Sequence, residues 1–169
     1  MSKAGSAFVV FLLLLGIYLV YTGTTNPVDV IAGGVAAAVI AALSADLVVS
    51  KPSKVFDPRR WVAFVIYAVK YLTVIEARAH LDVIRRILSP SLPVDPAIVR
   101  IPYAVSDDYA ITTIANSITN TPGTVVVDID TERKYMYVHW IDAKTTEDEG
   151  ARAHVSEEFE NYAKLIFEG

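Results

Sequence analysis

The sequence predicts an α-helical membrane part of two to three helices, followed by a small α+β cytoplasmic domain with the order β-α-β-β-α. The first observation is composition: 53% of the 169 residues are hydrophobic and only 20% charged, which is too apolar for a soluble protein. The second is charge, because nine Lys and Arg face five Asp and Glu up to Leu88, and six face fourteen beyond it. The third is that the long uncharged segments all lie in the basic half.

The same composition excludes several classes of protein. A disordered chain would need low hydrophobicity. A disulfide scaffold or a thiolate metal site would need cysteine, and the chain has none. The predicted organisation is therefore a membrane region over residues 1–88, a proline-rich linker over 89–96 and a soluble domain over 97–169.

Two membrane-spanning helices are expected near the start of the chain, over residues 4–22 and 28–49. Ala4 to Tyr21 carries no charge and is close to the roughly 20 residues that a span needs. The second helix follows Asn26 and Pro27, a residue pair that suits a helix start. A cleaved secretory signal is the competing interpretation of the first segment, but no small-residue cleavage pattern precedes the second. We therefore expect both segments to be retained as spans.

Small residues recur at helical spacing in the second segment. Gly34, Ala38 and Ala42 fall four residues apart and share a face with Asp46. Such a face lets another helix backbone approach closely. The predicted helix-packing residues are Gly33, Gly34, Ala38 and Ala42. Their partner is either the first helix or a helix of another subunit.

The loop after the second segment is basic, whereas the loop between the first two segments has no Lys or Arg. The basic residues of residues 50–60 are Lys51, Lys54, Arg59 and Arg60. The positive-inside rule places this loop, and the N-terminus with it, in the cytoplasm.

A half-apolar helix is expected over residues 61–88. Only about 15 of its residues are lipid-like, which is short for a span. We expect it to lie in the membrane interface or to tilt into a larger assembly, with the C-terminal domain left in the cytoplasm. A third span is the alternative, because neighbouring protein can shelter Lys70.

Three charges are candidates for an intramembrane role: Asp46, Lys70 and Glu76. An uncompensated charge in lipid costs at least about 2.5–3.5 kcal/mol, so charges there are often functional. Two or three helices cannot enclose an ion pathway by themselves. Any part in transport must therefore be shared with other subunits.

The soluble domain is predicted to begin with a strand over Ala97–Tyr103, which Pro102 marks as an edge strand or a strand end. Ser106 is expected to cap a helix running from Asp107 to about Thr119. Thr121-Pro122-Gly123-Thr124 has the residues of a type II turn.

Two strands, 125–130 and 135–141, then form a hairpin through residues 131–134. A last helix is expected to open with a capping box of Thr146 and Glu149 and to end near Phe167. A right-handed crossover would make the first two strands parallel in a small mixed sheet. With so few strands, one face or edge of the sheet is expected to rest on a partner or on the membrane surface.

No catalytic, cofactor-binding or metal-binding residue is predicted. His80, His139 and His154 lack metal-site spacing, and no phosphate-binding loop or nucleophile elbow occurs. Asp128 and Asp130 share a strand face that could suit a cation or acid–base work. We interpret them as the solvated side of a strand that buries Val127 and Ile129. The acidic residues Glu147, Asp148, Glu149, Glu157, Glu158 and Glu160 are interpreted as a solvated surface, which would also repel nucleic acid.

Four features occur together in this chain: two N-terminal spans, a basic loop leading to a tryptophan-headed third apolar helix, ITNTPGTVVVDID over residues 118–130, and Val138-His139-Trp140. With these features the chain resembles the E subunit of the Mrp-type multisubunit Na+/H+ antiporters. Asn120 departs from the leucine usual in that family and leaves the turn intact. Similar subunits occur in Mrp-like modules of membrane-bound hydrogenase and related ferredoxin-linked respiratory complexes.

This resemblance implies a multi-pass cell-membrane subunit without its own catalytic site or cofactor. Such a subunit assembles or stabilises a complex in which large antiporter-like subunits carry the ions, so its partners are other membrane subunits and the lipid bilayer. The alternative is a membrane-tethered regulatory domain that senses a small ligand or cation near Asp128 and Asp130. The transported ion, and whether the host is a stand-alone antiporter or a respiratory complex, stay open.

Overall fold

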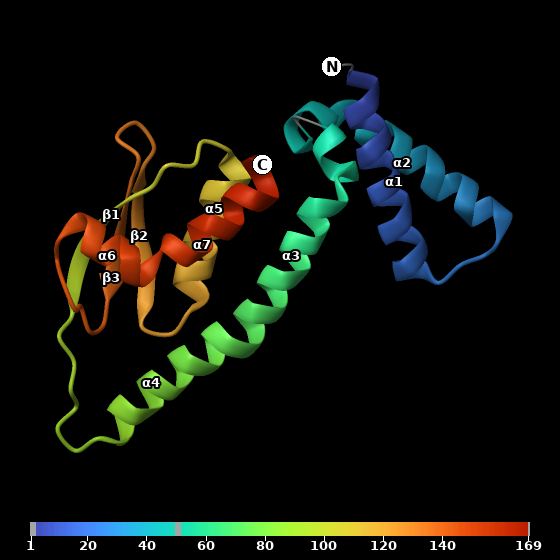
Figure 1. Ribbon diagram of the computed structural model, residues 1–169. Coiled ribbons are helices and arrows are strands. Elements are labelled where there is room, and N and C mark those ends of the chain that lie inside the picture. The colour runs from blue at the N-terminus through green and yellow to red at the C-terminus, as the bar shows by residue number, and fades with distance from the viewer. Residues whose placement is uncertain (1–2, 50–51, 169) are drawn as a thin grey trace. The chain divides into compact units, whose positions relative to one another are not determined.

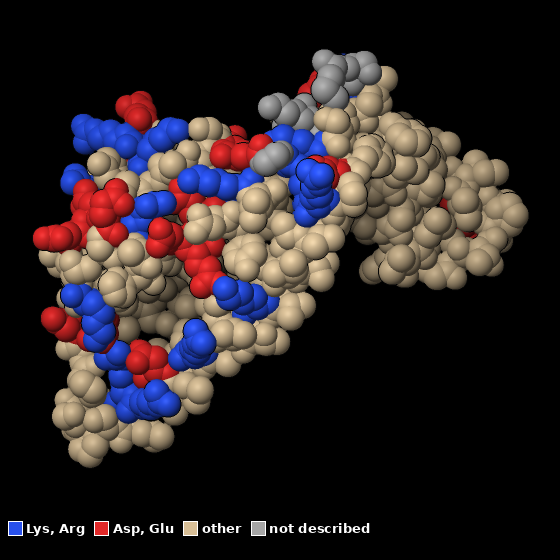
Figure 2. Space-filling model, viewed as in Figure 1, with Lys and Arg blue, Asp and Glu red and all other residues tan. Residues whose placement is uncertain are grey.

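The computed structural model describes residues 3–49 and 52–168, so Lys51 of the predicted basic loop lies outside the described residues. The chain divides into two compact units, Met1–Asp57 and Pro58–Gly169. The first unit contains α1 (Lys3–Thr22) and α2 (Pro27–Val48), followed by a 3-10 turn, Pro52–Phe56. Both helices are long and apolar enough to cross a membrane. Figure 2 shows few charged atoms on the visible surface of these two helices.

The start of α2 forms as its sequence predicts. The side chain of Asn26 accepts a hydrogen bond of 2.9 Å from the amide of Val28, and Pro27 is the first helical residue. This arrangement satisfies one of the amides that a helix leaves without a partner in its first turn.

The second unit begins with one long helical segment, drawn in green in Figure 1. It consists of α3 (Pro58–Lys70), a π-helical turn (Tyr71–Ile75) and α4 (Glu76–Leu88). The membrane region over residues 1–88 stays a prediction. The chain itself divides after Asp57, so the long helix belongs to the same compact unit as the α+β domain. The physical reason is that Tyr67, Tyr71 and Ile75 pack into the core of the α+β domain.

The sheet of the second unit has the order β1-β3-β2, with bounds Ala97–Pro102, Tyr135–Trp140 and Thr124–Asp130 respectively. Both outer strands pair antiparallel with β3. β1 and β2 therefore run parallel, as predicted, but they do not pair, so the predicted mixed sheet is wrong. β3 is the most aromatic of the three strands and contains no proline and no Asp, Glu, Lys or Arg. β1 ends in Pro102 and β2 carries two aspartates, so both suit an edge.

Three helices cover one face of this sheet: α5 (Asp108–Asn120), α6 (Asp148–Val155) and α7 (Glu157–Ala163), and a π-helical turn (Lys164–Glu168) follows (Figure 1). The element order β-α-β-β-α is thus confirmed, with the last helix divided at Ser156. The core contains the predicted apolar faces of these helices. Its members from them are Ile111, Ile114, Ala115, Ile118, Val155, Phe159, Tyr162 and Ile166.

Two predicted helix caps are wrong. Asp107 rather than Ser106 caps α5, because its carboxylate accepts a hydrogen bond of 3.0 Å from the amide of Tyr109. The capping box of Thr146 and Glu149 does not form, and Glu147 stands at the cap position of α6 without a side-chain cap hydrogen bond. In each case the helix begins one residue later than the motif indicated.

A β-bulge in β2 changes which of its side chains are buried. The register against β3 shifts between Val126 and Asp128, so Val127 is the extra residue. Val126 and Ile129 pack against the core, whereas Val127 is 52% exposed. The prediction that Val127 is buried is therefore wrong, because strict alternation does not hold across a bulge.

Candidate functional site

Small residues of α2 pack against α1. Most of them precede the predicted packing residues by one position in the sequence. The buried residues of α2 are Gly33, Ala37, Ala41 and Ala45. Gly34 is partly exposed, and Ala38, Ala42 and Asp46 are exposed. Only Gly33 of the predicted residues therefore packs on α1. Contact of Gly34, Ala38 and Ala42 with another subunit stays a prediction.

Gly33 and Gly34 provide a matched pair for testing this contact. A Cβ atom at Gly33 would overlap the ring of Tyr18, whereas one at Gly34 would meet nothing within 4 Å. Gly33→Ala is expected to weaken the α1–α2 contact by about 1–3 kcal/mol, the usual effect of overpacking. The measurement is the rate of disulfide formation between cysteines placed at Val10 and Ala41, which are both buried in this contact. Gly34→Ala should leave that rate unchanged, and equal rates in both variants would contradict the assignment.

The three candidate intramembrane charges each have a partner. Lys3 Nζ lies 3.1 Å from Asp46, and both side chains are exposed. Lys70 forms an ion pair with Glu158, and its ammonium lies 5.7 Å from the centre of the Tyr162 ring. These ion pairs leave neither Asp46 nor Lys70 as an uncompensated charge.

Glu76 is the most buried of the three, with 15% of its side chain exposed. Its Oε2 lies 3.4 Å from Nδ1 of His80, and its Oε1 is buried without a hydrogen-bond partner among the described residues. The described part of the chain contains no group of three or more His, Cys, Asp or Glu that could hold a metal ion.

The Thr121–Thr124 turn has the predicted geometry. Gly123 has φ +99°, which only glycine adopts at little cost, and the amide of Thr124 donates to the carbonyl of Thr121 at 3.3 Å. The turn is tied to its surroundings. The amide of Ile141 donates to the carbonyl of Gly123 at 2.8 Å, and a Cβ at Gly123 would lie 3.7 Å from Val83 of α4. The turn therefore lies between the end of β3 and the long helix.

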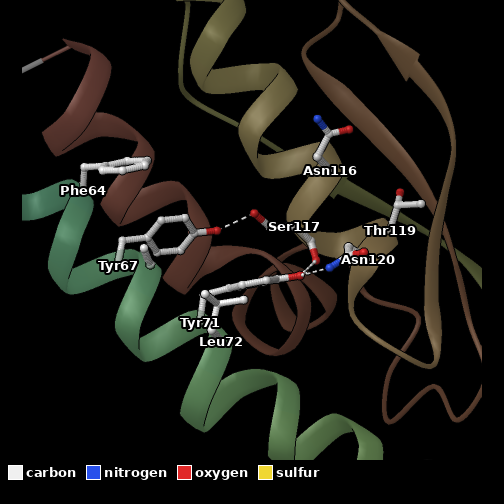
Figure 3. Close-up of a pocket in the computed structure, with 9 residues that line it drawn as sticks. Phe64, Tyr67, Tyr71, Leu72, Asn116, Ser117, Thr119 and Asn120 are labelled. Carbon is white, nitrogen blue, oxygen red and sulfur yellow. Dashed lines mark hydrogen bonds between the residues drawn. The ribbon is translucent and has the colours of Figure 1, made fainter. Parts of the chain in front are cut away.

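Two tyrosines attach the long helix to α5 (Figure 3). Ser117 donates its hydroxyl to the carbonyl of Thr113 at 2.7 Å, so the hydroxyl of Tyr67 is the donor in its hydrogen bond with Ser117. The hydroxyl of Tyr71 accepts a hydrogen bond of 3.0 Å from the side-chain amide (Nδ2) of Asn120. Burial is the main cause that raises the pKa of both phenols, so both stay neutral.

An open groove of about 570 Å³ lies along this attachment. Its two walls differ in character (Figure 3): aromatic and aliphatic side chains of the long helix form one, and uncharged polar side chains of α5 form the other. The residues that line it are Phe64, Tyr67, Ala68, Tyr71, Leu72, Asn116, Ser117, Thr119 and Asn120. None of them is an acid, a histidine or a cysteine. The groove can therefore accommodate an apolar or hydrogen-bonding group, and its residues are not suited to acid–base chemistry.

The sequence analysis did not predict that Tyr67 and Tyr71 act together in attaching the long helix to α5. The available signal was a pair of tyrosines four residues apart, at 67 and 71, within a largely apolar stretch of the helix. That spacing puts both on one helix face. It does not say which domain the face meets.

Asp128 and Asp130 bind local backbone groups. Asp128 accepts from the amide of Ile129 at 2.9 Å, and Asp130 accepts from the amide of Arg133 at 2.8 Å. Asp130 thus supports the hairpin turn. Neither observation favours a cation site at this pair.

One of the acidic residues predicted to be solvated is fully buried. Glu160 accepts hydrogen bonds from the amide of Ala104 and the ammonium of Lys164, each at 2.9 Å, and from Nε of Arg152 at 3.0 Å. Burial alone would raise the pKa of Glu160. The hydrogen bonds from Lys164, Ala104 and Arg152 outweigh it, so the pKa is lower than usual.

The sequence of this chain is similar to that of known proteins. Residues 11–166 match the MNHE family, described as Na+/H+ ion antiporter subunit. The chain is 38% identical over 69 residues to the E subunit of the Na(+)/H(+) antiporter of Alkalihalophilus pseudofirmus, covering 41% of this chain and 44% of that protein. It is 35% identical over 96 residues to the E1 subunit of the Na(+)/H(+) antiporter of Staphylococcus haemolyticus, covering 54% and 60%. The matches thus span about half the length of these curated relatives.

A solved structure matches almost the whole chain. It is a chain of the membrane-bound sulfane sulfur reductase, an archaeal respiratory membrane complex, with 30% sequence identity and a TM-score of 0.83. The match covers 96% of this chain and 99% of that one. Because the family match includes α2, the long helix and the α+β domain with its Thr121–Thr124 turn, the chain belongs to the MNHE family of Na+/H+ antiporter subunits.

Proposed function

We propose that this protein is a non-catalytic membrane subunit that assembles or stabilises an Mrp-type multisubunit cation/proton antiporter module. The observation that carries the proposal is the match of nearly its whole length to one chain of a respiratory membrane complex. Na+/H+ translocation would then belong to the complex, and this chain would support it through contacts with other membrane subunits. The α+β domain would lie in the cytoplasm, as the basic residues Lys51, Lys54, Arg59 and Arg60 predict.

The exposed small residues of α2 support this role. The contact with α1 buries four residues of α2, Gly33, Ala37, Ala41 and Ala45. Ala38 and Ala42 lie beside that contact and are exposed. A second helix backbone can approach closely over such residues. We therefore place the contact with another membrane subunit on this side of α2.

Co-purification tests the role directly. A tag after Gly169, extraction in mild detergent and mass spectrometry of what co-purifies should identify large antiporter-like subunits at near-equal amounts. Hydrogenase or other ferredoxin-linked subunits among them would assign the host to the respiratory class, which the likeness to the sulfane sulfur reductase favours. Recovery of the chain alone and well folded would contradict the proposal.

Ala38→Leu is expected to lower the yield of assembled complex several-fold, because the larger side chain would separate two closely packed backbones. Val39→Leu is the matched control, since Val39 is 55% exposed and already carries a branched side chain. The measurement is the amount of the large subunits recovered per tagged chain. Normal recovery and normal ion flux with Ala38→Leu would exclude this side of α2 as the contact.

A further inference from the structure

The long helix of the second unit leaves one apolar side unused by its own fold. The exposed residues of this side are Trp61, Val62, Val65, Ile66 and Val69 on α3 and Leu72 in the π-helical turn. The opposite side of the helix supplies Tyr67 and Tyr71 to the core. On α4 the exposed apolar residues are Leu81, Ile84, Ile87 and Leu88. We call these ten side chains the outer stripe.

The π-helical turn keeps the outer stripe on one side of the helix. In an uninterrupted α-helix, the spacing of Val69 and Leu72 would bring Glu76 next onto the same face. The amide of Glu76 instead donates to the carbonyl of Tyr71, five residues back, so the turn holds one extra residue. Ala77 therefore lies on this face in place of Glu76, and Leu81 of the outer stripe follows it four residues later. Glu76 turns away from solvent and is only 15% exposed.

Positive charge lies along one edge of the outer stripe on α4. Arg78 and Arg85 are seven residues apart, exposed, and without an ion-pair partner among the described residues. The nearby Asp82 is already bound by Arg86, which also pairs with Asp142 at 2.6 Å. The charges of Arg78 and Arg85 can therefore interact with an anionic group outside this chain.

The connection between α2 and the long helix is short. Nine residues, 49–57, separate the end of α2 from the start of α3. A chain of that length reaches at most about 30 Å when it is fully extended. The helix also begins near Trp61, a residue type enriched where membrane meets water.

We propose that the outer stripe lies in the plane of the membrane surface, with its apolar side chains at the headgroup–acyl boundary and Arg78 and Arg85 at the phosphates of anionic lipids. An amphipathic helix with basic residues flanking a continuous apolar side has the composition of such an interfacial helix. The inference requires α1 and α2 to be in the membrane and does not depend on the assembly role proposed above.

Spin labels can test the position of the stripe, because the chain has no cysteine of its own. Single cysteines at Val65 and Ile84 report on the stripe, and one at Glu132, exposed in the β2–β3 turn, is the control. The full chain is reconstituted in vesicles of phosphatidylcholine mixed with phosphatidylglycerol. Labels at 65 and 84 should collide more with oxygen than with a water-soluble nickel complex, and the label at 132 should do the reverse.

Two results would overturn the proposal. Labels at 65 and 84 could be as accessible to the nickel complex as the label at 132. Alternatively, they could become shielded only when the other subunits of the complex are reconstituted with the chain. The second result would show that a protein surface, not lipid, covers the stripe.

The arginines provide a second, independent measurement. One arginine near an anionic surface favours binding about fivefold. The double variant Arg78→Gln with Arg85→Gln should therefore lower the ratio of lipid-exposed to water-exposed label at position 84 about 25-fold. The loss should appear with phosphatidylglycerol and largely disappear in phosphatidylcholine alone. Arg133→Gln, on the hairpin turn, should change neither ratio. An unchanged ratio in the double variant, or an equal loss in both lipids, would contradict a contact with anionic lipid.

Discussion

Tyr67→Ala is expected to lower the free energy of unfolding of the second unit by about 3–5 kcal/mol, the range for deleting a large buried aromatic side chain. Tyr67 is 7% exposed, and its ring lies 5.8 Å from that of Tyr71 and 5.1 Å from that of Tyr162. Its loss would leave a cavity where the long helix meets α5 and α7. Thermal unfolding of the purified full chain, followed by near-ultraviolet circular dichroism, measures the effect.

Tyr67→Phe separates the ring from its hydroxyl. The ring packing is kept, and Ser117 still donates to the carbonyl of Thr113. Only one hydrogen bond is lost, so we expect about 1 kcal/mol. If Tyr67→Ala and Tyr67→Phe were equally stable, this ring would not be what attaches the helix to the domain.

Glu160→Gln is expected to destabilise the second unit by about 2–3 kcal/mol at neutral pH, because it removes charge-assisted hydrogen bonds from a buried carboxylate. The value lies below that for breaking a fully buried ion pair, since the side chains of Arg152 and Lys164 are 24% and 38% exposed and water can solvate them. Glu158→Gln is the control. Glu158 is 47% exposed, so its loss should change stability little.

The effect of Glu160→Gln should depend on pH in a defined direction. The folded state holds the pKa of Glu160 below its ordinary value of 4.5. The stabilisation is therefore complete above that ordinary value and is lost as the pH falls through the lower, folded-state pKa. Unfolding measured from neutral pH into the acid range should show the two proteins converging. A difference that stayed constant below the ordinary pKa would contradict the assignment.

Much of the fold follows from short-range patterns in the sequence. The apolar lengths of α1 and α2, the capping of α2 by Asn26 and the Pro122-Gly123 turn all depend on residues within a few positions of one another. The apolar spacing of α5 likewise predicts its buried side, which is confirmed. Pro102 was a correct signal as well, since it ends β1 at the edge of the sheet.

The site was less predictable, because its residues come together from distant positions. Tyr67 meets Ser117 across fifty residues, and Glu160 receives the amide of Ala104 across fifty-six. The periodicity of one helix says which side is apolar and not what that side meets. For the same reason, spacing alone could not decide between Gly33 and Gly34 as the residue that packs on α1.

By itself the sequence determined the elements: two apolar helices, a long half-apolar helix and a β-α-β-β-α domain, because hydrogen bonds and side-chain periodicity within each element are local. Only the tertiary structure decided that β3 lies at the centre of the sheet, that the long helix belongs to the second unit, and that Glu160 is buried among cations. The π-helical turn at Tyr71–Ile75 was likewise found only in the tertiary structure. These outcomes depend on burying apolar surface between segments far apart in the chain, which no local pattern specifies.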